Sequence, residues 1–363
     1  MRRWVWVWLL VALSAGVSLA QIGEVLDSGF RVNLRSAPNL NAPIVAVLEP
    51  RTPVLVLARS PGDTWYQVGL LDGRVGWVAA EYINIATLDA PFAFDAAVQV
   101  PFEVASMVAN INENTVAIFR RGQRLGNRPD VFSKVGDSIT ASPNTLAAIG
   151  EGLYDLGDYW YLQPVIEYYS HTPARLGSSF SNRSLAARVG WNTETVLDPS
   201  YADPSLCQPG ESPLACEYRW VQPAVALIML GTNDAGFMSV DVFRRNLSRI
   251  VETSILSGVI PVLSTIPPRL DRPEVNRRIG DFNIAIVDTA YIYNVPLMDY
   301  YSAMARLPGF GLAADGVHPT VAGRGYADSA VFNANTLRYG YNVRNLLLLT
   351  TLDALWRTVI ARG

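Results

Sequence analysis

From residue 129 onward, apolar segments of strand length alternate with longer stretches whose apolar residues repeat at helical spacing. This alternation favours a parallel β-sheet flanked by helices, because each return to a parallel strand needs a crossover. The candidate strands are residues 132–135, 224–230, 259–263 and 294–298. In such sheets, ligands and reactive side chains gather just beyond the carboxyl ends of the strands. We therefore expect a functional site among the polar residues at those ends.

The first part of the chain has a different pattern. Between residues 23 and 85, short alternating apolar stretches are separated by turn residues. One turn is Asp72-Gly73, a dipeptide typical of β-hairpins. The pattern predicts a small all-β barrel.

Two short segments of this barrel resemble the bacterial SH3-type domain, namely residues 33–38 (Asn-Leu-Arg-Ser-Ala-Pro) and 76–78 (Gly-Trp-Val). We assign residues 21–86 to such a domain. The resemblance implies a noncatalytic module that in exported bacterial proteins attaches to cell-wall peptides or polymers. The alternative is a barrel that only spaces or stabilises its neighbour. Three aromatic residues form either a binding face or, the favoured interpretation, part of the barrel's core: Trp65, Tyr66 and Trp77.

Near its start the chain has two basic residues, Arg2 and Arg3. Apolar residues follow as far as Leu13, and mostly small residues then lead to Ala20. These are the marks of a secretory signal peptide, so residues 1–20 are assigned to one, with an uncleaved anchor as the alternative. Removing the two arginines changes the formal net charge from −3 to −5. A mildly acidic protein is a poor partner for nucleic acid, and we expect an extracellular or cell-envelope location.

Later segments are not expected to span a membrane. The apolar residues 346–349 are soon followed by Asp353 and Arg357, which predicts an amphipathic terminal helix that covers a core. The two cysteines, Cys207 and Cys216, flank a short loop, and in an exported chain they are expected to form a disulfide.

Residues 87–128 are predicted to hold a linker and a lead-in helix. Apolar residues between 102 and 121 fall mostly at helical spacing. A basic cluster is interpreted as a solvated helix end: Arg120, Arg121, Arg124 and Arg128.

The chain contains only two histidines, His171 and His318. A serine hydrolase needs a neutral imidazole that accepts the proton of its nucleophile. His318 has Asp315 three positions before it, close enough across a tight turn to orient the ring, whereas His171 has no carboxylate nearby. His318 is therefore the candidate base.

Two of the predicted strands end in further candidates. The first leads into Gly136-Asp137-Ser138, where a glycine permits a sharp turn that presents the serine hydroxyl. The second leads into Gly231-Thr232-Asn233-Asp234, which places a side-chain amide at the same edge of the sheet. Such an amide can donate a hydrogen bond to the oxyanion formed when an ester carbonyl is attacked. Each motif alone is also ordinary turn or helix-cap chemistry.

Taken in order, the Gly-Asp-Ser, Gly-x-Asn-Asp and Asp-x-x-His-Pro motifs resemble the SGNH or GDSL hydrolase family over roughly residues 129–335. The resemblance implies a three-layer α/β/α, flavodoxin-like domain, assigned to residues 129–363, and ester hydrolysis through an acyl-enzyme. It implies that Ser138 is the nucleophile, His318 the base and then acid, and Asp315 the residue that orients the imidazole. Asn233 and the Ser138 backbone N–H would donate to the oxyanion.

The family also has a loop glycine whose backbone N–H completes the oxyanion hole. Gly190, in residues 187–191 (Ala-Arg-Val-Gly-Trp), is preferred for this role over Gly177. Ile139 stands where the family name has leucine, an apolar exchange with no expected consequence.

An aromatic stretch precedes Gly190: Tyr154, Tyr159, Trp160, Tyr161, Tyr168 and Tyr169. Aromatic rings stack on sugars, which with the wall-type module suggests acyl esters of carbohydrate, acetyl esters above all. The same rings also pack helices onto sheets, and this is the favoured interpretation. Lipid or lysophospholipid esterase, acyltransferase and noncatalytic wall-binding protein are the alternatives. No cofactor or metal is expected, because the two histidines lie apart from any acidic cluster.

Overall fold

The computed structural model describes residues 21–50, 52–60, 64–70, 74–85 and 107–362, and it divides the chain into two compact units, residues 1–90 and 91–363. The predicted signal at 1–20, the turn at Asp72-Gly73 and the linker from 87 to 106 lie outside the described residues. In the described part of the chain, the helices are all too short or too polar to cross a membrane.

The first unit is a seven-stranded antiparallel sheet with the strand order β3-β2-β6-β5-β4-β1-β7. Apolar side chains from alternate positions fill its centre, among them Leu34, Val56, Val68 and Val78. The small all-β unit predicted from the sequence is confirmed. Its strands are β1 (Gln21–Val25), β2 (Val32–Arg35), β3 (Ile44–Leu48), β4 (Pro53–Arg59), β5 (Trp65–Gly69), β6 (Val75–Ala79) and β7 (Ile83–Ile85).

The three barrel aromatics do not share one environment. Tyr66 packs against the core, as expected, whereas Trp65 and Trp77 are half-buried and stand outside the core cluster. Strand alternation explains the difference. In β6, Gly76 and Val78 face inward, so Trp77 faces outward. The expectation that all three rings form the core is therefore wrong for the two tryptophans.

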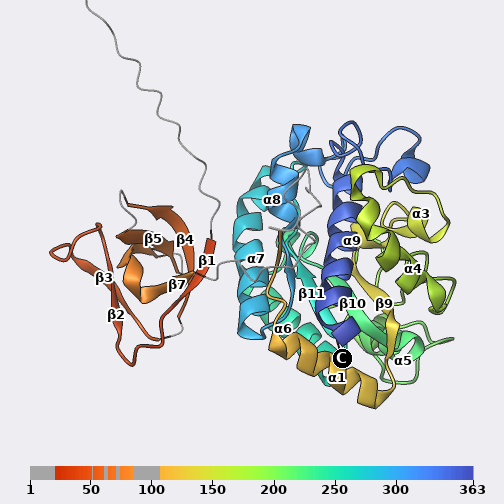
Figure 1. The fold of residues 1–363 in the computed structure, drawn as a ribbon, viewed down its shortest axis with the longest axis horizontal. Coiled ribbons are helices and arrows are strands. Elements are labelled where there is room, and N and C mark those ends of the chain that lie inside the picture. The colour runs from red at the N-terminus through yellow and green to blue at the C-terminus, as the bar shows by residue number, and fades with distance from the viewer. Residues whose placement is uncertain (1–20, 51, 61–63, 71–73, 86–106, 363) are drawn as a thin grey trace, which may run out of the picture. The chain divides into compact units, whose positions relative to one another are not determined.

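The second unit is built on a five-stranded sheet with the order β8-β12-β11-β10-β9 (Figure 1). Every pairing is parallel except that of β8 with β12. An isolated parallel bridge joins Gly136 to Ala187, so a further extended segment continues the sheet beside β9. The strands are β8 (Val108–Ala109), β9 (Arg128–Gly136), β10 (Pro223–Met229), β11 (Ile260–Ser264) and β12 (Leu297–Met298).

Helices cover both faces of this sheet. On one face, Tyr169 of α4 stacks edge-on against Phe132 of β9, with ring centroids 5.3 Å apart. On the other, Ser133 of the same strand donates a hydrogen bond of 2.8 Å to Glu217 of α5. Because successive strand residues point to opposite faces, α4 and α5 lie on opposite sides, which gives the predicted three layers. The principal helices are α4 (Gln163–His171), α5 (Pro213–Val221), α6 (Val240–Leu256), α7 (Pro273–Ile292) and α9 (Gly340–Thr358).

The lead-in helix begins later than predicted. Helix α1 spans Glu113–Leu125 and is capped by Asn112, whose side chain accepts hydrogen bonds from the N–H groups of Asn114 and Thr115. Residues 108–109 form the edge strand β8 instead. Arg128 belongs to β9, not to the helix end. The helical spacing at residues 107–112 was therefore misleading, because a cap residue and edge-strand pairing decide the local structure there.

The terminal helix α9 is not amphipathic. Residues 340–355 are buried on every side, including Asn342, Arg344, Asn345 and Asp353. These polar side chains find partners inside the protein: Asn345, for example, donates to the backbone oxygens of Asn144 and Ser329. A helix buried all round is a core helix, and internal hydrogen bonds make its polar residues tolerable there.

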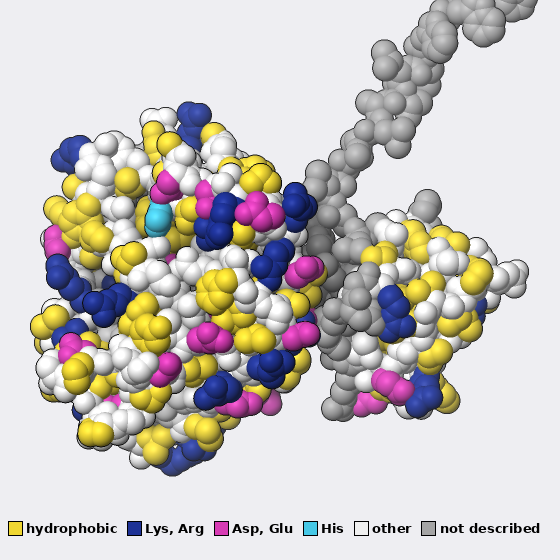
Figure 2. Space-filling model, turned by 180° about the vertical axis from the view of Figure 1, so that it is seen from behind, with side chains coloured by type: hydrophobic (Ala, Val, Ile, Leu, Met, Phe, Trp, Pro, Cys, Tyr) yellow, Lys and Arg dark blue, Asp and Glu magenta, His cyan; other side chains and the backbone are white. Residues whose placement is uncertain are grey.

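The disulfide between Cys207 and Cys216 is present and closes the loop that leads into α5. Figure 2 shows basic and acidic side chains interspersed with apolar ones over one face of the second unit.

Candidate active site

Ser138 lies directly beyond the carboxyl end of β9, at the first residue of the short helix α2 (Ser138–Ala141). Asp137 caps this helix, because its Oδ1 accepts a hydrogen bond of 2.9 Å from the N–H of Ile139. Gly136 permits close approach of the neighbouring strand rather than a special backbone conformation, because a Cβ at that position would lie 2.6 Å from the carbonyl oxygen of Met229. In the Gly-Asp-Ser sequence, the glycine therefore allows close packing at the strand end, the aspartate caps the helix, and the serine begins it.

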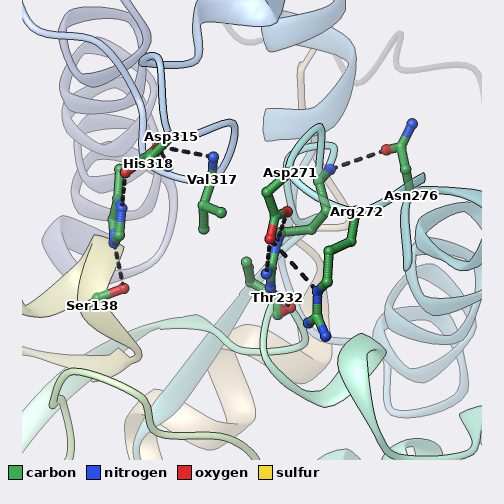
Figure 3. A network of polar contacts seen from close by, with 9 residues as sticks. Ser138, Thr232, Asp271, Arg272, Asn276, Asp315, Val317 and His318 are labelled. Carbon is green, nitrogen blue, oxygen red and sulfur yellow. Dashed lines mark hydrogen bonds and ion pairs between the residues drawn. The ribbon is translucent and has the colours of Figure 1, made fainter. Parts of the chain in front are cut away.

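His318 lies between Ser138 and Asp315 (Figure 3). Its Nε2 is 2.8 Å from the Ser138 Oγ, and its Nδ1 is 2.7 Å from the Asp315 Oδ2. The other carboxylate oxygen of Asp315 accepts hydrogen bonds of 2.9 Å each from the N–H groups of Val317 and His318. The three side chains named from the sequence therefore form one continuous relay.

The relay is open to solvent, since the side chains of His318 and Asp315 are 41% and 49% exposed. Partial burial acts to raise the pKa of Asp315, but the hydrogen bonds from Val317 and from the imidazole outweigh it and hold that pKa below its usual value. Asp315 is thus ionised at neutral pH and can hold the proton on the Nδ1 of His318, which leaves Nε2 free to accept one.

Asn233 and Gly190 lie on adjoining loops. The Asn233 Nδ2 donates a hydrogen bond of 2.8 Å to the carbonyl oxygen of Trp191, the residue after Gly190. The glycine loop in turn runs beside the strand that carries the serine, because the N–H of Arg188 donates to the carbonyl oxygen of Gly136 at 3.2 Å. Gly190 is exposed and has a φ of 80°.

Gly177 and His171 lie toward the other end of β9. Gly177 belongs to a turn whose Pro173 carbonyl accepts from Arg128, the first residue of that strand. His171 is the last residue of α4, and the next residue, Thr172, donates to Asp130 near the start of β9. Ser138 follows the opposite end of the strand.

A buried aspartate joins the two loops of the site. Asp234 accepts hydrogen bonds at one oxygen from both the N–H and the hydroxyl of Thr193, at 2.9 and 2.5 Å. Burial raises the pKa of Asp234 to about 6, against the hydrogen bonds from Thr193, which lower it. These bonds keep the loop after Gly190 in place beside Asn233.

Two buried arginines that sequence reasoning missed hold the site together. Arg269, 6% exposed, donates to the carbonyl oxygen of Thr232 at 2.7 Å and pairs through two nitrogens with Asp271, which Figure 3 shows beside Thr232. The neighbouring Leu270 N–H donates to the carbonyl oxygen of Gly316 at 2.8 Å. The loop after β11 therefore connects the asparagine turn to the histidine turn. The sequence shows this pair as Arg269-x-Asp271, six residues beyond the end of the third predicted strand at residue 263.

Arg344 of α9 is 2% exposed and donates to the hydroxyls of Thr140 and Thr145 at 3.0 and 2.7 Å. It thereby fixes the helix that begins at Ser138. No local signal marks this residue, because its partners lie about two hundred residues earlier in the chain.

The comparisons with known proteins agree with this geometry. The model of the GDSL-like lipase/acylhydrolase family matches residues 135–325, more than half of the chain, and that of the bacterial SH3 domain matches residues 31–84. The protein is therefore a hydrolase that acts on ester bonds. It belongs to the GDSL-like lipase/acylhydrolase family and carries a bacterial SH3 domain ahead of the hydrolase unit.

Several solved structures are similar to the chain. A lipase/acylhydrolase from Enterococcus faecalis is 20% identical, with 64% of this chain and 95% of that chain covered and a TM-score of 0.38. An acetylxylan esterase from Geobacillus stearothermophilus is 17% identical, with coverages of 61% and 93% and a TM-score of 0.39. A GDSL-like lipase from Bacteroides thetaiotaomicron is 16% identical, with coverages of 66% and 98% and a TM-score of 0.38. No curated protein matches the chain.

Replacing Asn233 with alanine is expected to lower kcat for a short acyl ester by about 10² to 10³ fold, because the predicted oxyanion donor is lost. Asn233→Asp should lower it at least as far, since a carboxylate repels the developing negative charge. Steady-state kinetics check both. The melting temperature of each variant serves as the control, because Asn233 also holds the Trp191 carbonyl. An Asn233→Ala enzyme with unchanged kcat would remove Asn233 from the oxyanion hole.

Proposed function

We propose that this protein is an exported serine esterase that removes acyl groups, acetyl above all, from carbohydrate or cell-wall polymers. The observation that carries the proposal is the relay from Ser138 through His318 to Asp315, with contacts of 2.8 and 2.7 Å at the carboxyl edge of the sheet. This arrangement suits a hydroxyl nucleophile with its base and the carboxylate that orients the base.

In the proposed mechanism, the Ser138 Oγ attacks the ester carbonyl while His318 Nε2 takes the hydroxyl proton. The backbone N–H groups of Ser138 and Gly190 and the Asn233 amide donate to the resulting oxyanion. His318 then gives its proton to the departing alkoxide, which leaves the acyl group on Ser138. A water molecule, deprotonated by His318, attacks this acyl-enzyme. The bond between the Ser138 Oγ and the acyl carbon breaks, the acid is released, and His318 returns the proton to Ser138.

Exposure of the relay supports a polymeric substrate. The half-exposed His318 and Asp315 leave the reacting groups reachable from a large molecule that cannot enter a closed pocket. Most of the aromatic stretch packs the core, as the favoured interpretation expects: Tyr159, Tyr161 and Tyr169 are buried, whereas Trp160 is exposed. The first two rings are packed against each other and Tyr159 also against Phe332.

A panel of substrates tests the proposal. The purified protein without residues 1–20 is incubated with acetylated glycans and with 4-nitrophenyl esters of increasing acyl length. Release of acetate from glycans, with activity that falls as the acyl chain lengthens, is the expected result. A preference for long acyl chains would instead identify a lipid esterase, and transfer of acetyl groups to added glycan would identify an acyltransferase.

The SH3 unit is proposed to hold the protein on cell-wall polymer through Trp65 and Trp77, which the fold leaves half-exposed on the outer side of the sheet. Replacing both with alanine is expected to reduce cosedimentation with insoluble peptidoglycan by about tenfold, because each lost aromatic contact weakens binding. Phe30→Ala is the matched control, since Phe30 is an exposed ring of the same unit. Equal sedimentation of all three proteins would assign the barrel a spacer role.

A further inference from the structure

A cavity of about 480 Å³ is lined by residues of α2 and of the segment that follows it, close in the chain to the proposed nucleophile. Two segments supply most of its wall. Residues 140–143 follow Ser138 and Ile139, and residues 181–184 and 187–189 lead up to Gly190. The cavity thus adjoins both the serine and the glycine loop, although neither Ser138 nor His318 lines it.

The wall contains a buried cation. Lys134 of β9 is 7% exposed and donates one hydrogen bond of 2.7 Å, to the carbonyl oxygen of Phe180. An ammonium group has three N–H bonds, so among the described residues two are left for another acceptor. Glu217 is near enough to influence Lys134, but its oxygens accept from the Ser133 hydroxyl and the Leu185 N–H. In the described part of the chain, no carboxylate forms an ion pair with Lys134.

Buried charges are normally paired, because removing an unpaired charge from water is costly. Burial lowers the pKa of Lys134 to about 8, and nearby Arg344 acts in the same direction while Glu217 opposes both. An anion in the cavity would favour the charged lysine. The unpaired ammonium therefore marks this wall as a place for a negatively charged ligand.

The rest of the cavity wall is also positively charged and polar. Arg183 and Arg188 line the cavity and are exposed, with Arg188 also near Asp203. Glu151 is the one acidic residue of the wall. Three cations against one carboxylate make the cavity positive, and the Ser142 and Ser181 hydroxyls add hydrogen-bonding groups suited to a sugar rather than to an acyl chain.

We propose that this cavity binds an acidic sugar, a hexose ring that carries a carboxylate, next to the ester that Ser138 attacks. The inference rests on the proposed function, because the acyl group would occupy the relay while the neighbouring sugar occupies the cavity. The volume fits a sugar ring and exceeds what an acetyl group needs. Lys134 contacts the carboxylate at the inner wall, and Arg183 and Arg188 contact it from the rim.

Binding to the inactive Ser138→Ala protein tests this without depending on catalysis. The protein is titrated calorimetrically with a galacturonic acid oligosaccharide and with a neutral galactose oligosaccharide of equal length. We expect the acidic ligand to bind at least tenfold more tightly, and added salt to weaken that preference. Lys134→Met in the same protein should weaken binding of the acidic ligand about tenfold, and the exposed Arg183→Gln about threefold.

Arg245→Gln, at an exposed arginine of α6, is the matched control and should leave binding unchanged. The inference would be overturned if the two ligands bound with equal affinity. It would also be overturned if neither Lys134→Met nor Arg183→Gln weakened binding of the acidic ligand. Hydrolysis of 4-nitrophenyl acetate by the parent protein is measured separately. Its failure would count against the proposed esterase mechanism and leave the binding result intact.

Discussion

Ser138→Ala is expected to reduce kcat for 4-nitrophenyl acetate by about 10⁵ to 10⁶ fold, because the atom proposed to form the acyl-enzyme is removed. The remaining rate comes from the oxyanion donors and from substrate binding, which do not depend on the hydroxyl. Steady-state and single-turnover kinetics measure the loss.

Ser200→Ala is the matched control for this substitution. Ser200 is an exposed serine whose replacement removes a hydroxyl far along the chain from the relay. It should leave kcat and the melting temperature unchanged. If Ser138→Ala kept the parent rate while retaining its fold, another residue would have to be the nucleophile.

His318→Ala should be nearly as damaging as Ser138→Ala, because an uncharged base at Nε2 is needed to take the hydroxyl proton at 2.8 Å. The double variant should be no slower than either single variant, since the two residues act as one unit. Added imidazole is expected to restore part of the activity of His318→Ala but none of that of Ser138→Ala. Additive losses in the double variant would contradict a shared relay.

Asp315→Asn should have a smaller effect, about 10² to 10³ fold, compared with roughly 10⁴ fold for a buried triad carboxylate. Asp315 is half-exposed, so water solvates much of the charge that the carboxylate would otherwise stabilise. The pH dependence of kcat/KM separates this effect from misfolding. Replacing the ionised carboxylate should change the shape of this profile, whereas a merely structural change would lower the rate evenly at all pH values.

The sequence predicted the layered α/β fold and the residues that meet at the candidate site. Ser138, Asn233 and the Asp315 to His318 turn each follow a recognisable apolar strand or form a short motif, so local pattern was enough to select them. The parallel arrangement of the strands followed from the same alternation. These features depend on neighbours within a few residues.

The features that the sequence did not predict depend mostly on contacts between residues far apart in the chain. The terminal helix α9 was expected to be amphipathic, but Asn345 finds its partners at Asn144 and Ser329. The strand β8 consists of two residues whose structure is decided by pairing with β12. Of the predicted strand at 294–298 only Leu297–Met298 pairs, because Asn294 has a φ of 50° and cannot continue a ladder.

Arg344 has a consequence for the order in which the site forms. Its partners Thr140 and Thr145 are 204 and 199 residues away, and His318 is 180 residues from Ser138. Contacts of such separation form late, because a long loop must close first. A chain synthesised only as far as residue 335 holds every member of the relay but not the arginine that secures the serine's helix. Esterase activity should therefore appear only when the last helix has docked, which makes it a direct assay for completion of folding.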